Sequence, residues 1–218
     1  MRRHLRIKAT GAVIPFDHQP LLTGTIHKWL GWNKEHGEIP LYSFSQLEGG
    51  KGTPKGLGYD REANFFFSSH NVDLVKKVIL GIQADPSMFF GLSVLEVIIQ
   101  EDPDLSDRVL FFPASPIFIK RRNEEKIDHI LYNDHRAPDC LKETLLTKMD
   151  KAGLKDETLR IQFEVDYPKA GSKLISYNGV QNRASWCPVI IEGQPETKLF
   201  AWNVGLGNST GIGFGAIK

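Results

Sequence analysis

The chain has 218 residues, enough for one large domain or for two domains of about 100 residues each. A hydrophobic fraction of 41% beside 24% charged residues is typical of a folded protein, and no uninterrupted apolar run reaches the ~18 residues of a membrane-spanning helix. The net charge of +1 argues against a uniformly basic surface, so any nucleic-acid binding has to rest on local basic clusters. Two such clusters occur: Arg2, Arg3, Arg6 and Lys8, and Lys120, Arg121 and Arg122.

The N-terminus and the cysteines indicate the compartment. Residues 1–8 are basic but lack the apolar core of a secretory signal. Cys140 and Cys187 stand alone, without the spacing of a metal site. We therefore expect a reduced, cytoplasmic protein that carries no metal and no cofactor.

The first predicted elements are a strand and an amphipathic helix. Residues 3–10 alternate apolar and polar side chains, as a half-buried strand does. A helix starts near Pro20, with Asp17 or His18 as its N-cap, and the glycines that follow predict its end before His36. Its apolar face has the spacing i, i+4, i+7 and i+8: Leu22, Ile26, Trp29 and Leu30.

Two strands, a second helix and a further strand come next. Residues 41–47 and 64–69 are predicted strands, and the glycine-rich residues 49–56 between them predict a hairpin tip. Asn71 is the predicted N-cap of the second helix, and residues 91–100 are the next predicted strand. The buried stripe of that helix is predicted from four apolar residues: Val72, Val75, Ile79 and Ile82.

The second half resembles a weaker copy of the first. Acidic residues and Pro103 mark a junction, so we predict domains at residues 1–103 and 104–218. Residues 137–153 predict a helix. Strands are predicted at residues 108–120, 159–165, 173–177, 188–192 and 199–204. The predicted fold class is α+β, with two tandem ferredoxin-like (βαββαβ) domains and a C-terminal glycine-rich loop.

The glycine-rich loop at residues 205–215 holds five of the 20 glycines: Gly205, Gly207, Gly211, Gly213 and Gly215. Glycine lets backbone N–H groups approach a ligand, commonly a phosphate, and three polar residues add side-chain donors: Asn208, Ser209 and Thr210. A P-loop is excluded because no lysine follows the glycines, and a dinucleotide-binding loop because no βαβ unit follows. Two interpretations stay open, a phosphate-binding loop and a tight turn that ends a sheet.

Four segments resemble motifs of the CRISPR-associated repeat-RNA endoribonucleases, the Cas six family. Residues 205–215 are similar to its glycine-rich signature, and residues 24–30 to its first-helix segment. His36 with residues 41–47 resembles its His-x-G and F-T-F-S block, and residues 114–117 resemble its S-P-I strand. The resemblance extends over nearly the whole chain, and four motifs in this order are far more specific than the glycine pattern alone.

The resemblance implies a metal-independent endoribonuclease that cuts CRISPR repeat RNA in the precursor transcript to give guide RNAs. The RNA's own 2′-hydroxyl is then the nucleophile, which leaves 2′,3′-cyclic phosphate and 5′-hydroxyl ends. The expected partners are repeat RNA and subunits of a CRISPR effector complex, with the chain a monomer or a homodimer. The alternative is a non-cleaving subunit that binds repeat or guide RNA in such a complex.

The resemblance also implies where the catalytic groups lie. His36 matches the family's catalytic histidine, and His27 stands where members carry a tyrosine or a second histidine. At about 100° per residue the two lie on opposite faces of an unbroken helix, so they converge only if the helix ends near Gly31. The lysine that some members place shortly after the histidine is missing, and Lys51 is the nearest downstream candidate. The preferred acid–base pair is His27 and His36, with roles unassigned.

RNA binding is predicted for the glycine-rich loop and for basic residues of the second half. The loop offers backbone N–H groups, and the basic side chains offer charge to phosphates. The predicted RNA-binding residues are Gly205, Gly207, Asn208, Ser209, Thr210, Gly211, Gly213, Gly215, Lys120, Arg121, Arg122 and Arg183.

Overall fold

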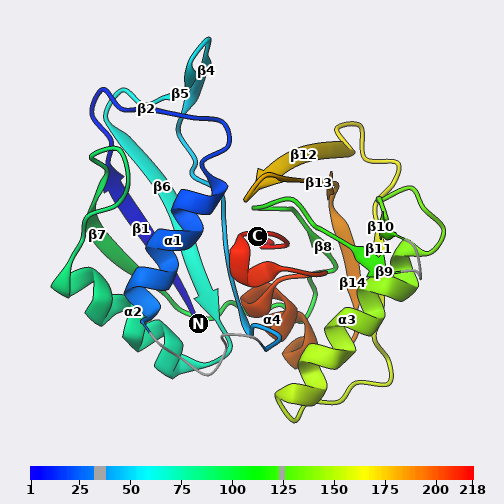
Figure 1. The fold of residues 1–218 in the computed structure, drawn as a ribbon. Helices are drawn as coiled ribbons and strands as arrows, with labels where there is room; N and C mark the ends of the chain where they lie inside the picture. The colour runs from blue at the N-terminus through cyan, green and yellow to red at the C-terminus, as the bar shows by residue number, and fades with distance from the viewer. Residues whose placement is uncertain (32–37, 123–125) are drawn as a thin grey trace.

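A computed structural model describes residues 1–31, 38–122 and 126–218. Two α+β domains lie side by side, and the C-terminal segment, red in Figure 1, occupies the space between them. None of the helices in the described residues is long and apolar enough to cross a membrane.

The first domain is a four-stranded antiparallel sheet with two helices over one face (Figure 1). The strand order is β3-β6-β1-β7, which is the ferredoxin-like order predicted from the sequence. The elements are β1 (Arg2–Lys8), α1 (Gln19–Leu30), β3 (Tyr42–Phe44), β6 (Glu62–Ser69), α2 (Val72–Ala84) and β7 (Ser93–Gln100). A small sheet of β2 (Val13–Ile14), β5 (Gly56–Gly58) and β4 (Lys51–Thr53) carries the glycine-rich hairpin, which projects at the top of Figure 1.

The predicted helix faces are mostly the buried ones. All four apolar residues predicted for the face of α1 are buried, and the helix ends at Leu30, with Gly31 as its C-cap. Asn71 caps α2 by accepting a hydrogen bond from the backbone N–H of Asp73. The predicted stripe of α2 was wrong at Val72, which is exposed, because the stripe runs instead through Leu74, Val75, Val78 and Ile82.

The second domain repeats this order with shorter strands. Its main elements are β8 (Leu110–Phe111), α3 (Ala137–Lys151), β11 (Arg160–Phe163), β14 (Val189–Glu192) and α4 (Pro195–Val204). The sheet order is β11-β14-β8, and beyond β8 the backbones of Phe112 and Lys218 exchange hydrogen bonds of 2.9 and 2.8 Å. The last residues therefore occupy the position that β7 has in the first domain. The remaining elements are β9 (Lys120–Arg122), β10 (Ile127–His129), β12 (Gly171–Tyr177), β13 (Val180–Trp186) and η1 (Thr210–Ile212).

The strand predicted at residues 199–204 is wrong, because this segment is the second half of helix α4. The helix begins with Pro195, a favourable first residue. The buried carboxylate of Asp156 accepts hydrogen bonds from the N–H of Gln194 and the hydroxyl of Thr197 at the same end. Seven of the ten residues of α4 are buried, and from Phe200 to Val204 every residue is, so this run has no amphipathic period and resembles a buried strand.

Arg2 joins the two domains. Its side chain is only 2% exposed, and its guanidinium lies 3.7 Å from the ring centre of Phe66 in β6 and 3.3 Å from that of Trp202 in α4. One of its nitrogens, Nη2, donates to the carbonyl oxygens of Trp202 at 2.6 Å and Ile217 at 2.7 Å. The basic cluster around Arg2 is thus partly internal to the protein. It does not form one exposed phosphate-binding stripe.

We predict that Arg2→Met lowers the free energy of unfolding by about 2–4 kcal/mol, because two buried carbonyl groups lose their donor. Urea unfolding followed by tryptophan fluorescence measures the change. The matched control is Arg6→Met, since Arg6 is exposed on the same strand and pairs with Glu62 and Glu96. An equal loss of unfolding free energy in both variants would mean that the contacts of Arg2 between the domains add no more stability than an exposed arginine does.

Candidate functional site

The glycine-rich loop follows α4 and runs between the two domains (Figure 1). Gly205 caps α4, and η1 lies in the middle of the loop. Most loop residues are buried; Asn208, Ser209 and Ile212 are the partly exposed ones. The loop is therefore a packed element whose accessible part is small.

The glycines of the loop make room for protein atoms. A Cβ on Gly213, whose φ is +88°, would collide with the side chains of Gln19 and Phe44. A Cβ on Gly215 would collide with the carbonyl oxygen of Leu206. Close packing against the first domain accounts for Gly213, and close packing within the loop accounts for Gly215, without a ligand. The predicted RNA-binding role of the loop glycines stays a prediction.

A polar stripe on α1 faces the loop. Gln19, Thr23 and His27 have the spacing i, i+4, i+8, which places them on one helix face. The side chains of Gln19 and Thr23 donate to the carbonyl oxygen of Ile212, at 2.9 and 3.2 Å. His27 Nε2 lies 3.2 Å from the carbonyl oxygen of Gly211. The structure therefore brings the predicted histidine to the predicted loop.

Tyr42 in β3 completes this contact. Its hydroxyl oxygen lies 3.3 Å from His27 Nε2 and 3.4 Å from the carbonyl oxygen of Gly211, and its side chain is buried. A carbonyl oxygen only accepts, so the bond between His27 and Gly211 requires the proton on Nε2. The other tautomer leaves Nε2 able to accept from the tyrosine hydroxyl. The imidazole nitrogen Nε2 thus has a hydrogen-bond partner in either tautomer.

Of the other two predicted catalytic residues, the structure describes only Lys51. His36 is outside the residues that the structure describes. Lys51 lies in β4, on the projecting hairpin, and its ammonium forms an exposed ion pair of 2.9 Å with Asp60. Sequence reasoning missed Tyr42, although it belongs to the segment that resembles the family's F-T-F-S block.

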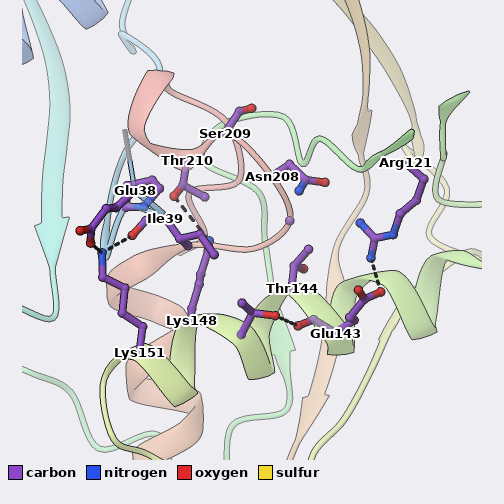
Figure 2. Close-up of a pocket in the computed structure, with 13 residues that line it drawn as sticks. Glu38, Ile39, Arg121, Glu143, Thr144, Lys148, Lys151, Asn208, Ser209 and Thr210 are labelled. Atoms are coloured by element: carbon purple, nitrogen blue, oxygen red, sulfur yellow. Dashed lines mark hydrogen bonds and ion pairs between the residues drawn. The ribbon is translucent and has the colours of Figure 1, made fainter. Parts of the chain in front are cut away.

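A cavity of about 760 Å³ lies on the α3 side of the loop (Figure 2). Residues 207–210 form one wall and α3 the other, with Glu38 to Pro40 at one end. Arg121 pairs with Glu143 at 2.7 Å, and Lys151 pairs with Glu38 at 2.8 Å. Arg121 is therefore directed to α3, unlike its exposed neighbours in β9.

Exposed basic residues gather beside the accessible part of the loop. The Asn208 side-chain oxygen accepts from the backbone N–H of Lys120 at 2.9 Å. His129 pairs with Lys120 across β9 and β10, and its Nδ1 lies 3.3 Å from the backbone N of Arg183. Lys120, Arg122 and Arg183 are all exposed. The structure thus brings together three of the predicted RNA-binding cations with the accessible loop residues.

The family model for CRISPR associated protein Cas6, C-terminal, matches residues 99–218. The chain belongs to the Cas6 family. A comparison with curated proteins found no match.

Solved structures share the fold over the full length. A structure titled "Characterization of a Cas6-related gene from Pyrococcus furiosus" has a TM-score of 0.86 at 21% identity and covers 100% of this chain and 97% of that chain. One titled "CRISPR associated protein Cas6" has 0.85, and one titled "An RAMP protein binding different RNA substrates" has 0.84, each at 21% identity with 100% and 98% covered. The predicted tandem ferredoxin-like fold of the Cas6 type is thereby confirmed.

We predict that Gly213→Ala destabilises the protein by about 2–4 kcal/mol, because the substitution adds overpacking to left-handed backbone strain. Gly91→Ala is the control, since Gly91 has φ +74° but open space around its Cβ position. Strain alone should cost about 1–2 kcal/mol there. Thermal unfolding compares the two variants, and equal losses would contradict the packing role of Gly213.

Proposed function

We propose that this Cas6-family chain is a metal-independent endoribonuclease that cleaves CRISPR repeat RNA in the precursor transcript. The observation that carries the proposal is the position of His27, which lies within 3.2–3.3 Å of both the Gly211 carbonyl oxygen and the Tyr42 hydroxyl at the junction of the domains. A histidine in contact with the loop whose accessible residue Asn208 adjoins the exposed Lys120 suits acid–base cleavage near neutral pH.

In the proposed reaction the 2′-hydroxyl oxygen of the RNA attacks the adjacent phosphorus. The bond from O2′ to phosphorus forms and the bond from phosphorus to O5′ breaks, which gives 2′,3′-cyclic phosphate and 5′-hydroxyl ends. One group takes the proton from the 2′-hydroxyl and another gives a proton to O5′. We propose His27 for one of these transfers and His36, on its resemblance to the family motif, for the other.

Tyr42 is proposed to orient His27. Because the hydroxyl of Tyr42 both donates and accepts, it stays bonded to the imidazole in either tautomer. Tyr42 is buried and comes from the sheet, so its position is fixed by the fold of the first domain.

RNA binding is proposed along the exposed cations beside the loop. Lys120, Arg122 and Arg183 contact phosphates, and the accessible Asn208 and Ser209 offer hydrogen bonds to backbone or unpaired bases. The buried loop glycines let the backbone beneath this surface pack closely. Lys51, on the separate hairpin, stays a proposed phosphate contact outside the acid–base group.

A second candidate function is RNA binding without cleavage. It is favoured by the likeness to the structure titled as an RAMP protein that binds different RNA substrates. The two functions differ in their need for histidines, because a binder has no use for acid–base groups at both position 27 and position 36.

We predict that the purified protein cleaves a cognate repeat RNA in the presence of EDTA. A single 2′-deoxy substitution at the scissile nucleotide should abolish cleavage at that site, because the nucleophile is missing, while binding stays within about threefold. Gel analysis of labelled RNA and product-end mapping measure both. Continued cutting of the deoxy substrate would exclude the 2′-hydroxyl mechanism.

We predict that His27→Ala lowers the single-turnover cleavage rate by about 10²–10⁴-fold, the usual contribution of general acid–base catalysis, with RNA affinity largely kept. His36→Ala should also abolish cutting. His135→Ala is the control, since that side chain is 93% exposed. Full activity of His27→Ala would remove this histidine from the proposed reaction.

A further inference from the structure

Lys148 in α3 is buried against the glycine-rich loop. Its side chain is 3% exposed, and Nζ donates to the carbonyl oxygen of Gly205 at 3.0 Å. A longer contact reaches the Thr210 hydroxyl at 3.4 Å (Figure 2). Another reaches the carbonyl oxygen of Val204 at 3.5 Å. The ammonium group therefore bridges two points of the loop, the end of α4 and the start of η1.

The ammonium group of Lys148 differs from the neighbouring cations in the kind of partner that it has. Among the described cavity residues, Arg121 and Lys151 each pair with a glutamate, whereas the partners of Lys148 are carbonyl and hydroxyl oxygens. Burial lowers the pKa of Lys148 to about 7. A buried cation without a counter-charge is costly, and the favourable field at the C-terminus of α4 offsets only part of that cost.

The loop connects Lys148 to the proposed reaction. Thr210, which Lys148 contacts, is followed by Gly211, whose carbonyl oxygen meets His27 and Tyr42. Lys148 approaches from the second domain, while His27 and Tyr42 approach from the first. One short backbone segment thus lies between the buried ammonium and the imidazole.

We propose that Lys148 is a positioning residue: by tying Gly205 to Thr210 it fixes the Gly211 carbonyl group against which His27 is oriented. The expected effect on the cleavage rate rests on the proposed endoribonuclease function. The coupling of Lys148 to His27 through the loop does not depend on whether the protein cleaves RNA.

The kinetic test compares Lys148→Met with Lys198→Met. Lys198 is a matched control, because it is also buried and donates to a backbone carbonyl oxygen, that of Ser106, at the other end of α4. Lys148→Met should lower kcat at least about tenfold with KM within about threefold, since misplacement of a catalytic group affects the chemical step. Lys198→Met should keep both constants, and Lys148→Arg should restore part of the rate. Equal kinetic effects of the two methionine variants would overturn the proposal.

The second test needs no cleavage. The NMR signals of the His27 ring, assigned by their loss in His27→Asn, report the surroundings of the imidazole. The hydrogen-exchange rates of the Gly211 and Ile212 amides report how firmly the loop is held. We expect shifted ring signals and faster exchange in Lys148→Met, but not in Lys198→Met. Unchanged signals would overturn the positioning role even if the RNA is cut. If the wild-type protein cuts no RNA, the proposed function fails, and these signals still decide the role of Lys148. If Lys148→Met does not fold, Lys148→Gln takes its place in both tests.

Discussion

The stacking of the Arg2 guanidinium between Phe66 and Trp202 is the contact on which the rest of the site depends. It attaches α4 to the open face of the first sheet, and the same guanidinium donates to the backbone of Ile217 in the C-terminal segment beside β8. Because the glycine-rich loop connects α4 to that segment, the loop has both ends fixed by one cation. Its middle is then held within reach of α1 on one side and α3 on the other.

The candidate site is a product of this docking. His27 and Tyr42 belong to the first domain and contact Gly211 of the loop, whereas Lys148 belongs to the second and contacts Gly205 and Thr210. Neither domain contains the arrangement alone. The loop glycines serve this arrangement by letting two domains approach one backbone closely, and the exposed cations of β9 and β13 lie beside its only partly exposed polar side chains among the described residues.

Much of the fold was predictable from the sequence. The buried face of α1, the cap Asn71 and the β-α-β-β-α-β order follow from local periodicity and capping. Helix α4 was missed because its second half is buried on nearly every side and therefore shows no amphipathic period. Tyr42 and Lys148 were missed for a different reason: their partners in the glycine-rich loop are more than fifty residues away in the chain, and no local pattern reveals such contacts. Arg2 was grouped with its basic neighbours as one cluster because the sequence alone does not show which of these side chains is buried.

The pairing of the C-terminal residues beyond β8 also determines when the site can form. Arg2 and its acceptor Ile217 are 215 residues apart, and the loop that carries Gly211 precedes that acceptor directly. Chains emerge from the ribosome N-terminus first, so the first domain can fold while its loop partner is still unmade. The histidine of α1 is therefore synthesised before the loop that it contacts. Assembly of the candidate site has to await synthesis of that loop, whereas the first sheet and its helices do not.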